Sequence, residues 1–97
     1  MSFDVLIGRN AKKYLPENLP SEFKEAIRSV LRAISDAPLE VSRVPPCPPF
    51  VPHGRLTEKW VDFQSSRYML RIFFEVDANR KQVGVTHISV QPQIGTS

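Results

Sequence analysis

Five prolines within residues 45–52 constrain the fold of this 97-residue chain more than any other feature of its sequence. They lie in the stretch "RVPPCPPFVPHGRL", residues 43–56. Each proline fixes its own φ angle and has no backbone N–H, so the stretch can form neither a helix nor a central strand. It therefore separates the elements that precede it from those that follow.

The first residues of the chain predict two short elements. Residues 3–7, "FDVLI", have the composition of a strand that ends at Gly8. Residues 9–15, "RNAKKYL", predict about two turns of helix, because three of their apolar side chains fall on one side. Pro16 closes this helix.

Residues 21–36 predict the longest helix, because their apolar side chains recur at spacings typical of one helix face. Ser21 is the expected N-cap, Glu22 lies in the first turn, and Pro38 ends the helix. The apolar stripe consists of Phe23, Ile27, Val30, Leu31 and Ile34.

A second stripe on this predicted helix is basic. Lys24, Arg28 and Arg32 follow one another at intervals of four residues. Like charges at this spacing repel one another slightly. Two interpretations remain open: the stripe is a solvated outer face, or it binds phosphate groups.

After the prolines, apolar residues recur at about every second position instead of at helical spacing. This pattern predicts strands at residues 58–64, 68–76 and 82–90. The connections "SSR" and "DANRK" are short. Parallel strands need long crossovers, so these three strands are expected to form an antiparallel meander.

Together these elements predict an α+β fold with the order β-α-α-β-β-β, in which a helical hairpin packs on one face of a mostly antiparallel four-stranded sheet. We expect one domain over residues 1–97, with residues 44–53 as a proline-rich connection and residues 91–97 as a tail. A polyproline segment advances about 3.1 Å per residue. Residues 45–52 therefore predict a rigid strap that carries the chain from the long helix to the sheet.

The strand at residues 68–76 has two different faces. The face expected to meet the helices carries Leu70, Ile72, Phe74 and Val76. The opposite face carries Met69, Arg71, Phe73 and Glu75. Arg71 is therefore expected in the middle of a strand, on the face that the helices leave bare.

Composition limits the function only weakly. A net charge of +3 permits contact with RNA, DNA or an acidic protein, but requires none of them. No apolar run approaches the ~18 residues of a membrane-spanning helix, and the first residues do not resemble a signal peptide. Cys47 is the one cysteine and has no His or Cys at metal-ligand spacing. We expect a cytoplasmic protein without a metal, a cofactor or membrane contact.

The segments "LRIFFEVD" (residues 70–77) and "VGVTHISV" (residues 83–90) resemble two strands of the RelE/ParE superfamily of bacterial type II toxins. The order of the preceding elements also agrees, over about residues 3–90. Members of that superfamily include ribosome-dependent mRNA endoribonucleases, poisons of DNA gyrase, and proteins of no known activity. Most of them pair with a small antitoxin protein.

The resemblance implies a toxin, or a toxin homologue, of a toxin-antitoxin system. It would be an mRNA endoribonuclease that inhibits translation on the ribosome. The alternative is a catalytically degenerate or gyrase-directed ParE-like binding protein without ribonuclease activity. This alternative follows from two departures: Trp60 and Asp62 stand where the nucleases present lysines, and the tail "QPQIGTS" lacks their basic residues.

The resemblance also implies site residues. Arg71 matches the arginine that contacts the scissile phosphate in the nucleases, and Tyr68 is a candidate for proton transfer. Counting back across "DANRK" sets Arg71 opposite His87, where the pair would hold a phosphate and move a proton. In the alternative interpretation, His87 is structural and stacks on an aromatic ring, and Trp60 or Asp62 lies beside Arg71.

A wider RNA-binding surface is predicted around these residues. Trp60 and Tyr68 would stack on bases, while basic side chains hold phosphates. The basic candidates are Arg55, Lys59 and Arg67, together with Arg71. A third interpretation makes the chain an adaptor, because Arg43, Pro46 and Pro49 fit an R-x-x-P-x-x-P ligand pattern.

Overall fold

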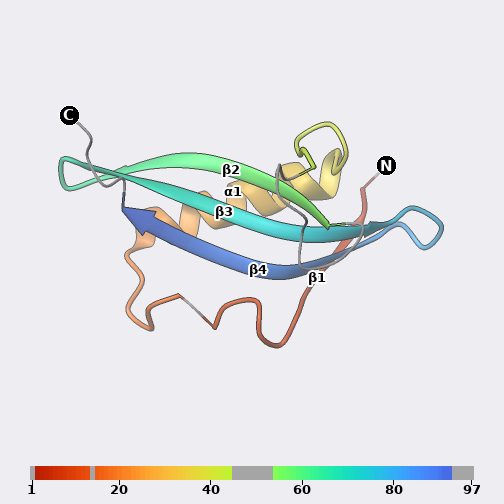
Figure 1. Ribbon diagram of the computed structural model, residues 1–97, viewed down its shortest axis with the longest axis horizontal. Coiled ribbons are helices and arrows are strands. Elements are labelled where there is room, and N and C mark those ends of the chain that lie inside the picture. The colour runs from red at the N-terminus through yellow and green to blue at the C-terminus, as the bar shows by residue number, and fades with distance from the viewer. Residues whose placement is uncertain (1, 14, 45–53, 93–97) are drawn as a thin grey trace.

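A computed structural model of the chain describes residues 2–13, 15–44 and 54–92. One helix packs on one face of a four-stranded mixed sheet, which is an α+β architecture (Figure 1). The elements in chain order are β1 (Asp4–Ile7), α1 (Ser21–Asp36), β2 (Gly54–Phe63), β3 (Ser66–Asp77) and β4 (Gln82–Pro92).

The sheet has the strand order β1-β4-β3-β2. β2, β3 and β4 pair antiparallel, which confirms the predicted meander, and β1 pairs parallel with β4. β1 and β2 are therefore the two edges of the sheet. Beside β2, Arg43 exchanges two backbone hydrogen bonds with Leu56, at 3.0 and 2.9 Å.

α1 forms as its apolar period predicts. Its buried face packs on the sheet and consists of Phe23, Ala26, Ile27, Val30 and Ile34. The expected N-cap is wrong by one residue: Pro20 precedes the first turn, and the Ser21 hydroxyl instead donates to the Glu22 carboxylate at 3.0 Å. The helix ends where the Ala37 N–H donates to the Ala33 carbonyl, one residue before Pro38.

The core lies between α1 and the central strands. Leu70, Ile72 and Phe74 of β3 are almost completely buried, as their shared face predicts. Val83, Val85 and Ile88 of β4 complete this layer. Because side chains alternate along a strand, the neighbouring residues of β3 point to the face without a helix.

The predicted helix at residues 9–15 is not formed. The described part of this segment consists of turns, in which the N–H groups of Ala11, Lys13 and Leu15 each donate to the carbonyl three residues earlier. The Ala11 carbonyl accepts from the Ile88 N–H at 2.8 Å, so it is engaged by β4 rather than by a helical N–H four residues on. No helical hairpin is therefore present within the described residues.

The rigid strap predicted over residues 45–52 stays a prediction. Residues 45–53 lie outside the described part of the chain. The residues on either side of them, Arg43 and Leu56, are paired side by side. After this stretch β2 begins at Gly54, before the predicted start at residue 58.

The connections between the strands are shorter than predicted. Gln64 and Ser65 form a two-residue turn with φ angles of 49° and 63°, which is typical of a tight β-hairpin. Asp77 pairs with Gln82, so the next loop comprises residues 78–81. β4 also continues to Pro92, into the region predicted as a tail.

Candidate functional site

The sheet face opposite α1 carries a polar cluster centred on β3. The strand register places Arg71 directly between Glu58 of β2 and Ser89 of β4. Directly opposed side chains on one sheet face have Cβ atoms about 5 Å apart, so these three can interact. The prediction that Arg71 lies away from the core, on the bare face, is confirmed.

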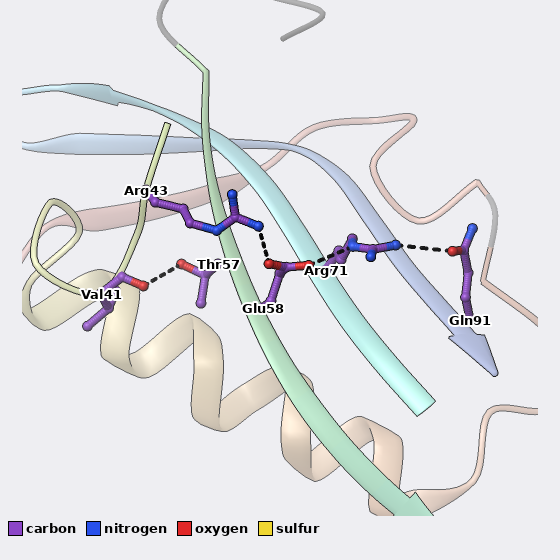
Figure 2. Close-up of polar contacts among 6 residues, drawn as sticks. All are labelled: Val41, Arg43, Thr57, Glu58, Arg71 and Gln91. Carbon is purple, nitrogen blue, oxygen red and sulfur yellow. Dashed lines mark hydrogen bonds and ion pairs between the residues drawn. The ribbon is translucent and has the colours of Figure 1, made fainter. Parts of the chain in front are cut away.

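One carboxylate joins two guanidinium groups in this cluster (Figure 2). Arg71 Nε donates to Glu58 Oε2 at 2.8 Å, and Arg43 Nη2 donates to the other oxygen, Glu58 Oε1. On its far side Arg71 Nη1 donates to Gln91 Oε1 at 3.2 Å. Residues from β2, β3, β4 and the segment after α1 thus meet at one point.

The two arginines control the charge of Glu58. Hydrogen bonds from Arg43 and then Arg71 hold the pKa of the Glu58 carboxyl below its ordinary value, against the opposing effect of partial burial. Glu58 is therefore ionised at neutral pH. Its side chain is 21% exposed and that of Arg71 is 37% exposed, so solvent and ligands reach both groups.

The predicted pairing of Arg71 with His87 is wrong. His87 lies opposite Phe73, and the two rings meet edge-on with centroids 5.6 Å apart. Two features cause the shift: the β3–β4 loop is one residue shorter than predicted, and Thr86 forms a bulge beside Phe73 and Phe74. Each moves the register by one residue, so His87 keeps the same face as Arg71 but lies diagonal to it.

The predicted neighbour of Arg71 on β2 is also wrong. The two-residue turn after Phe63 places Glu58 opposite Arg71, whereas Trp60 faces Met69 and Asp62 faces Arg67. Glu58 is therefore the functional candidate that sequence reasoning missed. Glu58 lies on the same face of β2 as Trp60 and Asp62, because side chains alternate along a strand. With the correct turn length, the sequence would have placed Glu58 opposite Arg71.

Two of the predicted RNA-binding residues meet on the bare face. The Arg67 guanidinium carbon lies 5.8 Å from the centroid of the Trp60 ring, and Arg67 Nε donates to Asp62 Oδ1 at 3.1 Å. Trp60 is 49% exposed. Because it belongs to the same face as Arg71, this ring is placed where a stacked base could reach it.

Tyr68 and Arg55 lie on the opposite side of the sheet from Arg71. The Tyr68 ring meets the Phe23 ring of α1 edge-on at 5.0 Å, so it belongs to the packing between helix and sheet. Arg55 Nε donates to Ser42 Oγ at 2.6 Å, and its Nη2 donates to the Ser42 and Leu39 carbonyls. These bonds fasten the chain after α1 to β2. The structure does not bring either side chain to the Arg71 cluster.

The side chains of Thr57 and Lys59 lie on the face of β2 that is turned toward α1. Lys59 is exposed at this sheet edge, away from the Arg71 cluster. The Thr57 hydroxyl donates to the Val41 carbonyl at 3.0 Å, which adds a second attachment of the segment after α1 (Figure 2). This attachment helps to position Arg43 beside Glu58.

The described residues contain neither a metal-ligand cluster nor a membrane-spanning helix. Over residues 2–13, 15–44 and 54–92, no three His, Cys, Asp or Glu side chains gather as a ligand set, and Cys47 lies outside these ranges. Within the same part of the chain, α1 is too short and too polar to cross a membrane.

Comparisons with known proteins give this site no precedent. No protein-family model matches the chain, and neither the curated proteins nor the solved structures contain a match to it.

Proposed function

We propose that the bare sheet face binds the phosphodiester backbone of RNA, and that the chain is a RelE/ParE-like toxin, or toxin homologue, with endoribonuclease activity. The observation that carries this proposal is the convergence of Arg43 and Arg71 on one oxyanion, the Glu58 carboxylate. Paired guanidinium groups bind phosphate oxygens in the same manner. The resemblance of residues 70–77 and 83–90 to toxin strands supports the family, although the described residues place one helix rather than a pair on this sheet.

The proposed reaction is attack by a ribose 2′-hydroxyl on the adjacent phosphate. The O2′–P bond forms and the P–O5′ bond breaks, which leaves a 2′,3′-cyclic phosphate and a 5′-hydroxyl. Glu58, which is ionised, accepts the proton of the 2′-hydroxyl, and Arg71 stabilises the negative charge on the non-bridging phosphate oxygens. His87 donates a proton to the departing O5′. His87 lies diagonal to Arg71 on the same sheet face, within reach of long side chains.

The surroundings of this site provide binding surface for RNA. Trp60 offers an exposed ring for base stacking, and Arg67, which is itself exposed and pairs with Asp62, lies over that ring. In a toxin of this kind the expected targets are mRNA and the ribosome, and the expected protein partner is an antitoxin.

A second candidate function is binding without catalysis, either as a degenerate toxin or as a gyrase-directed ParE-like protein. The observation that favours it is that Glu58 already occupies the two guanidinium groups, while His87 packs edge-on against Phe73. In this case the cluster fastens β2, β3 and β4 together, and the bare face contacts a protein.

The test is cleavage of mRNA by the purified chain in a reconstituted translation system, read by primer extension and by detection of the cyclic phosphate. The proposal expects cleavage that falls about 100-fold in Arg71→Ala, the loss typical of removing one charge-stabilising group. Arg80→Ala is the matched control, because Arg80 pairs with Asp77 at the remote β3–β4 loop. Growth arrest with DNA damage and intact mRNA would instead establish the gyrase-directed alternative.

A further inference from the structure

An open apolar groove runs along α1, on the side of the sheet away from Arg71. It lies between the helix and the β1–α1 connection, and its volume is about 570 Å³. Ile27 and Leu31 of α1 form one wall, Leu15 and Leu19 of the connection form the other, and Ile7 of β1 lies at one end. In Figure 1 the connection curves away from the sheet before it returns to the first turn of α1.

The groove exists because one helix cannot cover this sheet. A helix with its side chains is about 10 Å wide, whereas four strands spaced about 4.8 Å apart span more than 14 Å. The connection that would supply a second helix forms turns instead, since β4 engages the Ala11 carbonyl. Ile7 consequently remains 41% exposed although it is apolar. The apolar flank of α1 therefore lacks a partner along this groove.

The rim of the groove is basic. Lys12, Lys24 and Arg28 line it, against the single acidic side chain of Glu17. Within the described residues, none of these three cations uses its side chain in a hydrogen bond or an ion pair. Apolar walls with unneutralised positive charge at the rim are complementary to a ligand that is both apolar and acidic.

We propose that this groove binds an acidic amphipathic helix of a partner protein. That helix would lie beside α1 as the second helix of the layer, with its apolar side chains between Leu15, Ile27 and Leu31. Its carboxylates would pair with the basic rim. Lys24 and Leu31 are about 10 Å apart along the α1 axis, so about two turns of the partner fit the groove. The proposal is independent of RNA cleavage, because it uses the opposite side of the sheet.

The test uses a designed peptide as the probe. A fluorescein-labelled peptide of about 18 residues is long enough to populate a helix in water, with leucines on one face and glutamates beside them. Fluorescence anisotropy at two salt concentrations measures its binding to the full chain. We expect saturable binding that weakens at high salt, and at least about tenfold weaker binding to the Lys24→Glu/Arg28→Glu variant.

Two further variants separate charge from shape. Arg32→Glu changes the same basic stripe but does not line the groove, so it should alter the affinity by less than about twofold. Ile7→Ser tests the apolar end and should weaken binding about threefold or more. Circular dichroism and thermal unfolding confirm that each variant is folded.

Several results would overturn the proposal. These are the absence of saturable peptide binding up to about 1 mM, equal binding of a peptide with lysine in place of glutamate, or an equal loss in Arg32→Glu. Self-association of the chain that Lys24→Glu/Arg28→Glu abolishes would assign the groove to a second copy. Binding of an RNA oligonucleotide, but not of the peptide, at Lys24 and Arg28 would assign their charges to phosphate.

Discussion

On the bare sheet face Arg43 and Arg71 each donate to a carboxylate, whereas on the groove side of α1 Lys24 and Arg28 have no such partner within the described residues. Both surfaces draw several basic residues from the sequence. The difference arises because neighbouring strands bring side chains of opposite charge together, while neighbours four residues apart on α1 are alike. Counting basic residues therefore does not reveal which of them are available to a ligand.

The largest expected effect on the comparison between the two surfaces comes from removing the charge of the Glu58 carboxylate. Glu58→Gln keeps the shape of the side chain but cannot accept a proton, so mRNA cleavage should fall about 100-fold. RNA affinity should rise about threefold at the same time, because Arg43 and Arg71 lose their counter-ion. Cleavage assays and filter binding measure the two quantities on the same protein.

The matched control for this variant is Asp62→Asn. Asp62 pairs with Arg67 on the same face, so its loss also frees a cation but leaves Glu58 intact. Cleavage should change by less than about threefold. An equal fall in both variants would mean that Glu58 acts only through charge, and unchanged cleavage in Glu58→Gln would contradict its role as the base.

A smaller effect is expected on stability. A double-mutant cycle between Arg71→Ala and Glu58→Gln should give a coupling of about 1 kcal/mol at pH 7, as is usual for a partly exposed pair. The folded-state pKa of Glu58 lies below its ordinary value of 4.5. The pairing therefore stabilises the fold above pH 4.5, and this contribution is lost as the pH falls through the lower, folded-state value.

Urea unfolding at pH 7 and at pH 3 measures this coupling. A cycle that includes Lys24→Ala and Glu58→Gln is the comparison, since Lys24 belongs to the groove side and should not couple to Glu58. A coupling between Arg71 and Glu58 that persists undiminished in acid would show that it does not depend on the ionised carboxylate.

The smallest expected effect is a gain in stability rather than a loss. Arg28→Glu converts two repulsive contacts, with Lys24 and Arg32, into attractive ones, although it opposes Glu25 three residues earlier. The net result should be a gain of about 0.3 kcal/mol in the free energy of unfolding, measured by thermal or urea unfolding. A fall of more than about 0.5 kcal/mol in the free energy of unfolding would indicate that Arg28 has a stabilising partner. The groove side would then no longer differ from the bare sheet face in this respect.

The sequence was informative about elements whose periodicity spans many residues. The apolar stripe of α1 and the alternation of β3 identified the helix, the meander and the face of Arg71 correctly. Both patterns repeat several times, so an error of one residue at either end leaves the prediction unchanged.

The candidate site was less predictable because it depends on register. One residue fewer in the β3–β4 loop and one bulged residue at Thr86 replaced His87 by Ser89 opposite Arg71. A two-residue turn, rather than a longer one, replaced Trp60 by Glu58. Local sequence hardly distinguishes such turns, yet each determines which side chains meet.

Residues 9–15 illustrate the same limit for a short element. Their composition permits a helix, but about two turns of isolated helix have little stability of their own. A hydrogen bond from the Ile88 N–H to the Ala11 carbonyl ties the segment to β4, and its described residues form turns. This contact joins residues far apart in the sequence, and the groove beside α1 is its consequence.

By itself the amino-acid sequence determined the long helix, the three-stranded meander and the side of β3 on which Arg71 emerges, since these follow from periodicities within single segments. Only the tertiary structure decided that Arg43 and Arg71 share Glu58, and that Lys24 and Arg28 of α1 border an open groove. The physical reason is that both outcomes rest on contacts between distant segments, whose alignment is fixed by turns, a bulge and one backbone hydrogen bond.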